Sequence, residues 1–110
     1  RDNWYPTRDL SADQRYQSKS MALIAARAQQ AFFEYNVIPY NADEAQRVFR
    51  VIPCGPLADL FALDLRSYRG PNSENRQKTL TDDSRVMGAT QVEWLKTRLL
   101  ASQAVWKVIA

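Results

Sequence analysis

The sequence predicts an α/β fold in which a long helix, a β-hairpin, an irregular loop, a second helix and a final strand follow one another. Three observations predict it: apolar residues recur twice at helical spacing, two apolar runs flank a turn rich in proline, and the chain closes on another alternating run. The chain has 110 residues, of which 45% are hydrophobic and 25% charged. This composition is typical of one globular unit and not of a disordered chain.

The first helix is predicted between an N-terminal loop, residues 1–10, and Pro39. Ser11-Ala12-Asp13-Gln14 has the form of a capping box, so we expect the helix to begin there. One apolar face then follows at steps of three and four residues, formed by Met21, Ile24, Ala25, Ala28, Phe32 and Tyr35. The many alanines would let this helix lie close to a sheet.

The hairpin is predicted over residues 47–65. Residues 47–52 alternate in polarity and residues 57–65 are mainly apolar, which predicts two strands. Between them stands Pro53-Cys54-Gly55-Pro56, in which the prolines interrupt a strand ladder and Gly55 accepts a positive φ.

The second half of the chain is predicted to hold a long loop, a helix and a strand. Residues 66–88 show no periodicity, and a loop of that length is usually functional or mobile. Thr90 and Glu93 have capping-box spacing, and residues 92, 95, 99 and 102 share one helix face. Residues 105–110 alternate as a strand does. Trp94 and Trp106 are expected in the core or at an interface.

Composition excludes several functions. The net charge is only +3, and the chain contains no histidine and a single cysteine. No block of Lys and Arg forms a nucleic-acid patch, and no apolar run approaches the roughly 18 residues of a membrane span. The missing histidine removes the commonest transition-metal ligand and the usual general base at neutral pH. Cys54, without a histidine to activate it, is expected to be structural.

Charged residues follow the second strand of the hairpin and are the first candidates for chemistry. Asp64 and Arg66 flank Leu65, so on a strand they would point the same way. Two interpretations stay open: a salt bridge at a strand end, or a guanidinium aimed at an anion. Tyr68 and Arg69 would add a second anion contact.

Three further groups carry alternatives. Gly70, Asn72, Ser73 and Asn75 could cradle a phosphate, although turns have the same composition. Asp82 and Asp83 could bind a hard cation or be solvated turn residues. Trp4 and Tyr5 could wall a pocket or be ordinary loop residues.

Several segments resemble a known family. The stretch Leu63 to Asn72 resembles the Asp-x-Arg-x-Tyr-Arg segment of the alkaline phosphatase D family of metal-dependent phosphoesterases. Met87 to Leu95 is similar to the family's Leu-Gly-x-x-Gln-x-x-Trp-Leu helix start, and the resemblance continues through residues 102–109. Arg1-Asp2-Asn3-Trp4 is similar to the residues that follow the family's Trp-Asp-Asp-His-Glu-Val metal motif.

The resemblance implies a four-layer α/β/β/α metallophosphoesterase sandwich. Residues 1–110 would be one piece of its single catalytic domain, between the Asp-His-Glu motif and a later Gly-Asp-x-His motif, and would lack the main metal-binding motifs. Because the chain begins without methionine and stops within an apolar alternation, we also expect a piece of a longer protein. Exposed strand edges would then let it self-associate.

The function that the resemblance implies is hydrolysis of phosphate monoesters or diesters by the intact parent. Arg66 would be the catalytic residue of this piece, while Asn3, Tyr68 and Arg69 would bind substrate. Asn3 could instead be a metal ligand. Metal ions, with calcium and iron suggested by the family, would be held elsewhere in the parent, so we expect no metal on these residues and no activity from them alone. The resemblance also implies an exported, periplasmic or secreted, protein. The alternative is a non-catalytic module that binds an anion or a partner through residues 66–75.

Overall fold

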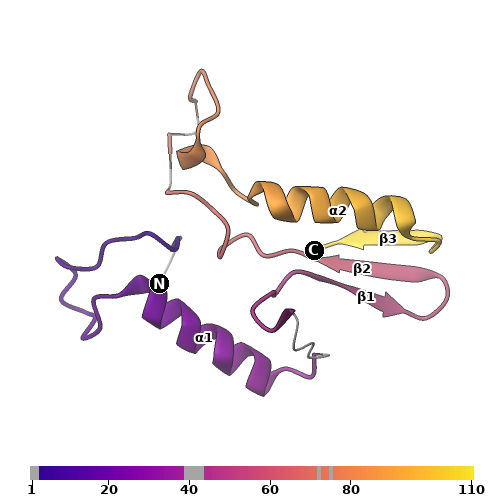
Figure 1. The fold of residues 1–110 in the computed structure, drawn as a ribbon, viewed down its shortest axis with the longest axis horizontal. Coiled ribbons are helices and arrows are strands. Elements are labelled where there is room, and N and C mark those ends of the chain that lie inside the picture. Colours follow the sequence, from indigo (N-terminus) through magenta and orange to yellow (C-terminus); the bar gives the residue numbers. More distant parts are fainter. Residues whose placement is uncertain (1–2, 39–43, 72, 75) are drawn as a thin grey trace.

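The computed structural model describes residues 3–38, 44–71, 73–74 and 76–110. Its elements follow the predicted order of helix, hairpin, loop, helix and strand (Figure 1), and so confirm a mixed α/β arrangement. They are α1 (Met21–Tyr35), β1 (Arg50–Cys54), β2 (Ala58–Ala62), the short 3₁₀ helix η2 (Asp82–Ser84), α2 (Ala89–Ala101) and β3 (Trp106–Ile109).

The three strands form one sheet in the order β1-β2-β3. β1 and β2 pair antiparallel around Gly55, whose φ of 74° confirms the predicted turn. β2 and β3 pair parallel, with Leu60 opposite Val108, so α2 is the crossover between them. The hairpin strands differ from the predicted bounds, because Pro53 and Cys54 belong to β1. Proline is tolerated there since β1 is an edge strand.

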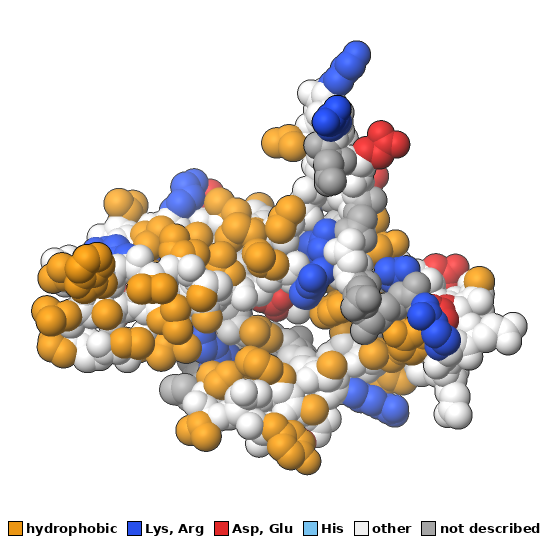
Figure 2. Space-filling model, turned by 180° about the vertical axis from the view of Figure 1, so that it is seen from behind, with side chains coloured by type: hydrophobic (Ala, Val, Ile, Leu, Met, Phe, Trp, Pro, Cys, Tyr) orange, Lys and Arg blue, Asp and Glu red, His pale blue; other side chains and the backbone are white. Residues whose placement is uncertain are grey.

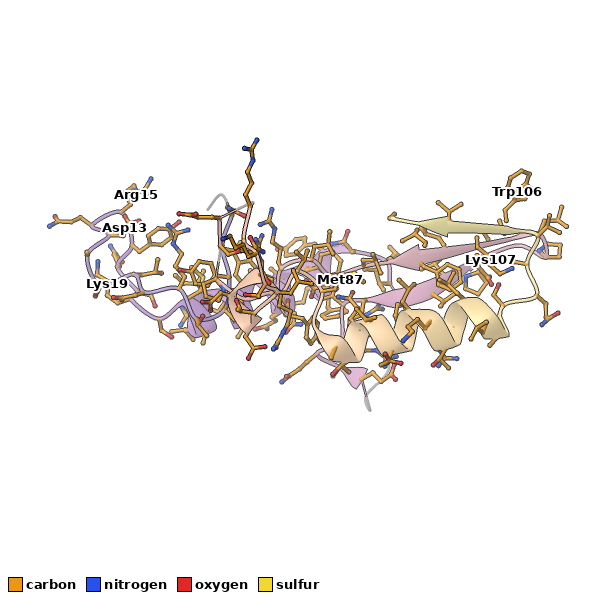
Figure 3. All side chains as sticks on the ribbon, turned by 90° about the horizontal axis from the view of Figure 1, so that it is seen from above. Asp13, Arg15, Lys19, Met87, Trp106 and Lys107 are labelled. Atoms are coloured by element: carbon orange, nitrogen blue, oxygen red, sulfur yellow. The ribbon has the colours of Figure 1, made fainter. Side chains whose placement is uncertain are left out.

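The helix α2 covers only one face of this sheet. At its end the hydroxyl of Ser102 donates to Asp59 Oδ2 over 2.6 Å, which places Asp59 and its same-side neighbour Phe61 under the helix. Trp106 lies on the side of β3 away from α2 (Figure 3) and is 68% exposed, so it is not a core residue. Hydrophobic side chains gather over this uncovered face (Figure 2).

The hydrophobic core is small. Among the described residues four apolar side chains are buried: Leu10, Met21, Phe49 and Phe61. Trp94 is half-buried and packs edge-on against the buried ring of Phe49, with ring centroids 4.7 Å apart, so this tryptophan lies at the edge of the core.

The first helix begins ten residues later than the predicted cap. Ser20 is its N-cap and accepts a hydrogen bond from the N–H of Leu23. The prediction of a capping box at Ser11 is wrong, because the hydroxyl and N–H of Ser11 both donate to the carboxylate of Asp9 and close a local turn.

The expected close approach of α1 to the sheet is also wrong. The two lie apart in Figure 1, and the alanines of α1 line a cavity instead. Among the described residues, neither helix combines the length and hydropathy of a membrane span.

The second helix begins at Ala89, after Gly88, and not with a Thr90 capping box. Gly88 is the N-cap at φ 75°, and no side chain caps the helix. A Cβ on this glycine would lie 3.0 Å from the Cβ of Tyr68, so the glycine allows a close approach as well as the turn. The buried face of α2 includes Gln91, which is fully buried, whereas Val92 is 37% exposed. The buried face of α2 therefore starts at Gln91, one residue before the predicted start at Val92.

The described residues between 66 and 88 are mostly irregular, as predicted, apart from η2. It is closed by Gly70, whose N–H donates to the carbonyl of Arg85 over 2.9 Å. A Cβ on Gly70 would come 2.1 Å from the carbonyl oxygen of Asp82, so only glycine fits without a shift of the backbone.

Candidate functional site

The candidate site begins where β2 ends, because a buried carboxylate turns the chain there. Asp64 is 7% exposed, and its Oδ1 accepts hydrogen bonds from the N–H of Arg66 at 2.9 Å and of Ser67 at 2.8 Å. This Asx-type turn takes the backbone out of the strand direction. Arg66 is exposed as a result, directly beyond the rigid sheet.

A second residue, Gln91, fixes the same turn from α2. Its Oε1 accepts from the N–H of Asp64 at 2.7 Å, and its Nε2 donates to the carbonyl of Asp64 at 2.8 Å. Nε2 also donates to the carbonyl of Met87 at 3.0 Å. The buried amide thus pairs with both backbone groups of one residue and ties the end of β2 to the start of α2.

Two guanidinium groups converge beside this turn on one amide oxygen. Arg66 Nη1 and Arg69 Nη1 donate to Asn3 Oδ1 over 3.0 Å and 2.9 Å. The φ of Asn3 is +53°, a region that asparagine tolerates better than most residues. The structure therefore brings together three of the four predicted site residues, from positions more than sixty residues apart in the chain.

Of the two interpretations of Asp64 and Arg66, these contacts exclude the salt bridge at a strand end. The carboxylate of Asp64 accepts a hydrogen bond from the backbone N–H of Arg66 and not from its guanidinium. The guanidinium of Arg66 donates to Asn3 instead. The prediction that the two side chains lie side by side on a strand is wrong, because the strand ends at Ala62. Asp64 positions Arg66 through the turn.

The fourth predicted residue, Tyr68, points toward the core. Its ring packs edge-on against Phe49 with centroids 5.3 Å apart. Burial, followed by the negative charge of Asp64, raises the pKa of the Tyr68 phenol above its usual value. Tyr68 shares with Arg66 and Trp4 the lining of a cavity of about 540 Å³ next to α1, so Trp4 does wall a pocket.

The predicted phosphate cradle at Gly70 to Asn75 is only partly described. Asn72 and Asn75 lie outside the described residues, and Ser73 is exposed. The N–H of Gly70 is engaged by the carbonyl of Arg85 and cannot donate to a phosphate, so this part of the hypothesis is wrong. Arg69 nevertheless lines, with Asn3 and Ser73, a second cavity of about 550 Å³.

The described residues do not fit a metal site. Among them no three Asp, Glu or Cys side chains converge as ligands. Asp82 forms an ion pair with Arg85, and Cys54 is a free, exposed thiol at the end of β1. We therefore assign no catalytic step to a metal held by these residues.

Sequence reasoning missed Gln91, which it placed inside a capping box. A signal was present, since Gln91 stands three and four residues before Trp94 and Leu95, on the half-buried side of α2. A glutamine at a buried phase of a helix predicts hydrogen-bond partners inside the protein.

Comparison with known proteins places the chain in a family. Separate searches of curated proteins and of solved structures each found no significant match. The family model described as PhoD-like phosphatase matches residues 1–110, the whole of the chain. The segments Asp-x-Arg-x-Tyr-Arg and Gln-x-x-Trp-Leu, which resemble those of this family, contact each other through the buried hydrogen bond between Gln91 and Asp64. Since the family model covers the whole chain, the chain belongs to the PhoD-like phosphatase family.

Proposed function

We propose that these residues form the phosphate-binding side of a metal-dependent enzyme that hydrolyses phosphate monoesters or diesters. The observation that carries the proposal is the convergence of Arg66 and Arg69 on Asn3 Oδ1. Arg66 is the catalytic residue of this side, because its guanidinium is exposed and would touch the phosphoryl group. Asn3, Tyr68 and Arg69 bind the substrate around it.

Electrostatics favours an anion at this cluster. Two positively charged guanidinium groups point donors at one amide oxygen, so these donors are oriented toward the same place. A phosphate would accept charge-assisted hydrogen bonds from both planar forks. As the phosphoryl group is transferred, negative charge on its oxygens is stabilised by donors that are already in place.

The metal in this proposal comes from elsewhere in the polypeptide, since the described residues offer no ligand group. The likeness to metal-dependent phosphoesterases suggests calcium and iron. The part played by the described residues is to bind and orient the phosphate, and residues 1–110 alone should be inactive.

We further propose that the chain is one part of a larger four-layer sandwich. Its accessible surface is 8427 Å², against about 6,200 Å² expected for a compact monomer of this mass. Its radius of gyration is 16.4 Å, against about 13 Å expected for this length. The uncovered sheet face around Trp106 would pack on the second sheet of the domain. Where that second sheet is absent, the same face would support self-association.

The test uses the intact phosphatase that carries these residues. Arg66→Lys keeps the charge and removes the planar fork. We expect kcat/KM for a phosphate ester to fall about 100-fold, as for loss of one oriented donor to a transition state. Arg27→Lys, an exposed arginine of α1, is the matched control and should be neutral. Circular dichroism and thermal melting verify folding of both variants.

The alternative function is a non-catalytic module that binds an anion through residues 66–75. It uses the same arginines, so it also predicts that phosphate binding weakens in Arg66→Lys. It differs in predicting no ester hydrolysis by the intact wild-type protein. A folded Arg66→Lys variant that turns over substrate at the wild-type rate would show that Arg66 is structural.

A further inference from the structure

A cavity of about 540 Å³ opens beside Arg66, between α1 and the segment that follows β2. Its volume is within the range of small-molecule sites. Its walls come from three parts of the chain: the N-terminal segment, one face of α1 and the turn after β2. The lining residues that matter here are Trp4, Ala22, Ala25, Phe32, Leu63 and Arg66.

The polar groups of this cavity lie mainly on one wall, residues 64–68, and two of the polar side chains that line it hold other parts of the chain. The carboxylate of Asp64 holds the turn. On the facing side the amide of Gln29 donates to the carbonyl of Gln46. Most of the remaining lining is aliphatic or aromatic, so a bound polyol would find few hydrogen-bond partners for the water that it loses, whereas an apolar group would gain by burial.

Arg66 is the positively charged residue among those that line the cavity, and it lies at the end where we propose that the phosphate binds. Arg66 lines the cavity, and its Nη1 donates to Asn3, which is not among the lining residues. A phosphate held by Arg66 would therefore have the cavity on one side and Asn3 with Arg69 on the other. Any group esterified to that phosphate could extend along the apolar wall.

We propose that this cavity receives the alcohol part of the substrate, and that the enzyme prefers phosphate esters of apolar, aromatic-sized alcohols over those of polyols. The inference rests on the proposed function of Arg66. In the reaction, the oxygen of water forms the new bond to phosphorus and loses a proton. The alcohol oxygen leaves with the electron pair of the broken P–O bond and takes up a proton, inside the cavity.

The small side chains of α1 provide the space. Ala22, Ala25 and Ala26 lie at steps of three and four residues on the side that lines the cavity. Leucine at position 25 would occupy part of it and keeps a high helix propensity. Ala31 is exposed on the same helix and is not a lining residue, so Ala31→Leu is a matched control.

The experiment compares 1-naphthyl phosphate with glycerol phosphate as substrates of the intact enzyme. The wild type should have the higher kcat/KM for the naphthyl ester. Ala25→Leu should lower that value about tenfold, the size expected when a hydrophobic pocket loses space for its ligand. The same variant should lower kcat/KM for glycerol phosphate less than for the naphthyl ester, because glycerol is smaller and needs less of the cavity, and Ala31→Leu should change neither value. Ala25→Ser, which keeps the volume and adds a hydroxyl, covers the case in which Ala25→Leu does not fold.

The outcomes separate this inference from the proposed function. If Arg66→Lys slows both esters but Ala25→Leu and Ala25→Ser affect them equally, the cavity is not the alcohol site and the function of Arg66 stands. Equal kcat/KM of the wild type for the two esters would also overturn the inference. If the wild type hydrolyses neither ester, the proposed function itself fails.

Discussion

The two helices are held to the molecule in different ways. α2 and its C-cap contact the sheet, or residues next to its strands, at three points: Gln91 bonds to Asp64, Trp94 packs against Phe49, and Ser102 bonds to Asp59. α1 buries one residue, Met21, and beyond it leaves large apolar side chains exposed. These are Leu23 at 43%, Phe32 at 38% and Tyr35 at 86%.

This difference matches the tasks that we propose for the two helices. A phosphate-binding guanidinium has to be held within a fraction of an ångström, and α2 fixes the turn that carries Arg66 through buried hydrogen bonds. A wall for an apolar alcohol needs shape and small side chains rather than oriented donors. The comparison therefore predicts that mutations on α2 lower stability and turnover together. Mutations on α1 should have smaller effects on these two properties.

The largest effect should come from Gln91→Ala. The change leaves the buried N–H and carbonyl of Asp64 without their partner, and each unsatisfied group costs about 1–3 kcal/mol. We expect the free energy of unfolding to fall by about 3 kcal/mol, measured by urea denaturation, and turnover to fall in the protein that remains folded.

The control for that change is Gln30→Ala on α1. Gln30 is exposed and donates to Glu34 one turn later, a pair worth about 0.2–0.5 kcal/mol. Equal losses in the two variants would contradict the contrast between the helices, because the buried amide would then be worth no more than a surface one.

A smaller loss is expected at the start of α1. Ser20→Ala removes the hydroxyl that accepts from the N–H of Leu23, and loss of such a cap costs about 1 kcal/mol. Ser11→Ala is the matched control, since Ser11 bonds to Asp9 in a turn that precedes the helix. A larger loss for Ser11→Ala than for Ser20→Ala in denaturation would restore the capping box expected from the sequence.

The fold was predictable where periodicity and turn chemistry agreed. The hairpin around Gly55 and the alternating run at residues 105–110 have patterns that local sequence specifies. Both helix starts were missed, because Ser11 and Thr90 have capping-box spacing while the real caps, Ser20 and Gly88, depend on where the chain turns. Sequence spacing gives the candidates for a cap and tertiary structure selects among them.

The candidate site shows which residues the sequence could nominate and which part of their geometry it could not predict. Arg66 and Arg69 were identified beside the strand end, and Asn3 entered only through the resemblance to the family. That all three meet at one oxygen depends on contacts more than sixty residues apart, which no local pattern encodes. The orientation of Arg66 away from Asp64 depends in turn on the strand ending at Ala62, two residues before the carboxylate.

The smallest effect that we expect to measure lies on the α2 side and depends on pH. The pKa of Tyr68 is raised in the folded protein, mainly by burial and then by Asp64. As pH rises through 10.0, the ordinary value, the phenol ionises more readily in the unfolded chain than in the folded one. The stability that the neutral phenol contributes is therefore complete below that pH and is lost as pH rises toward the folded-state value.

Denaturation between pH 8 and 11 should show this loss of stability in the wild type, and the loss should be smaller in Tyr68→Phe. Tyr35→Phe, on the exposed end of α1, corrects for removal of a tyrosine hydroxyl. If Tyr68→Phe follows the same alkaline profile as the wild type, the environment of Tyr68 does not favour its neutral form, and the tight packing assigned to the α2 side would be wrong at that position.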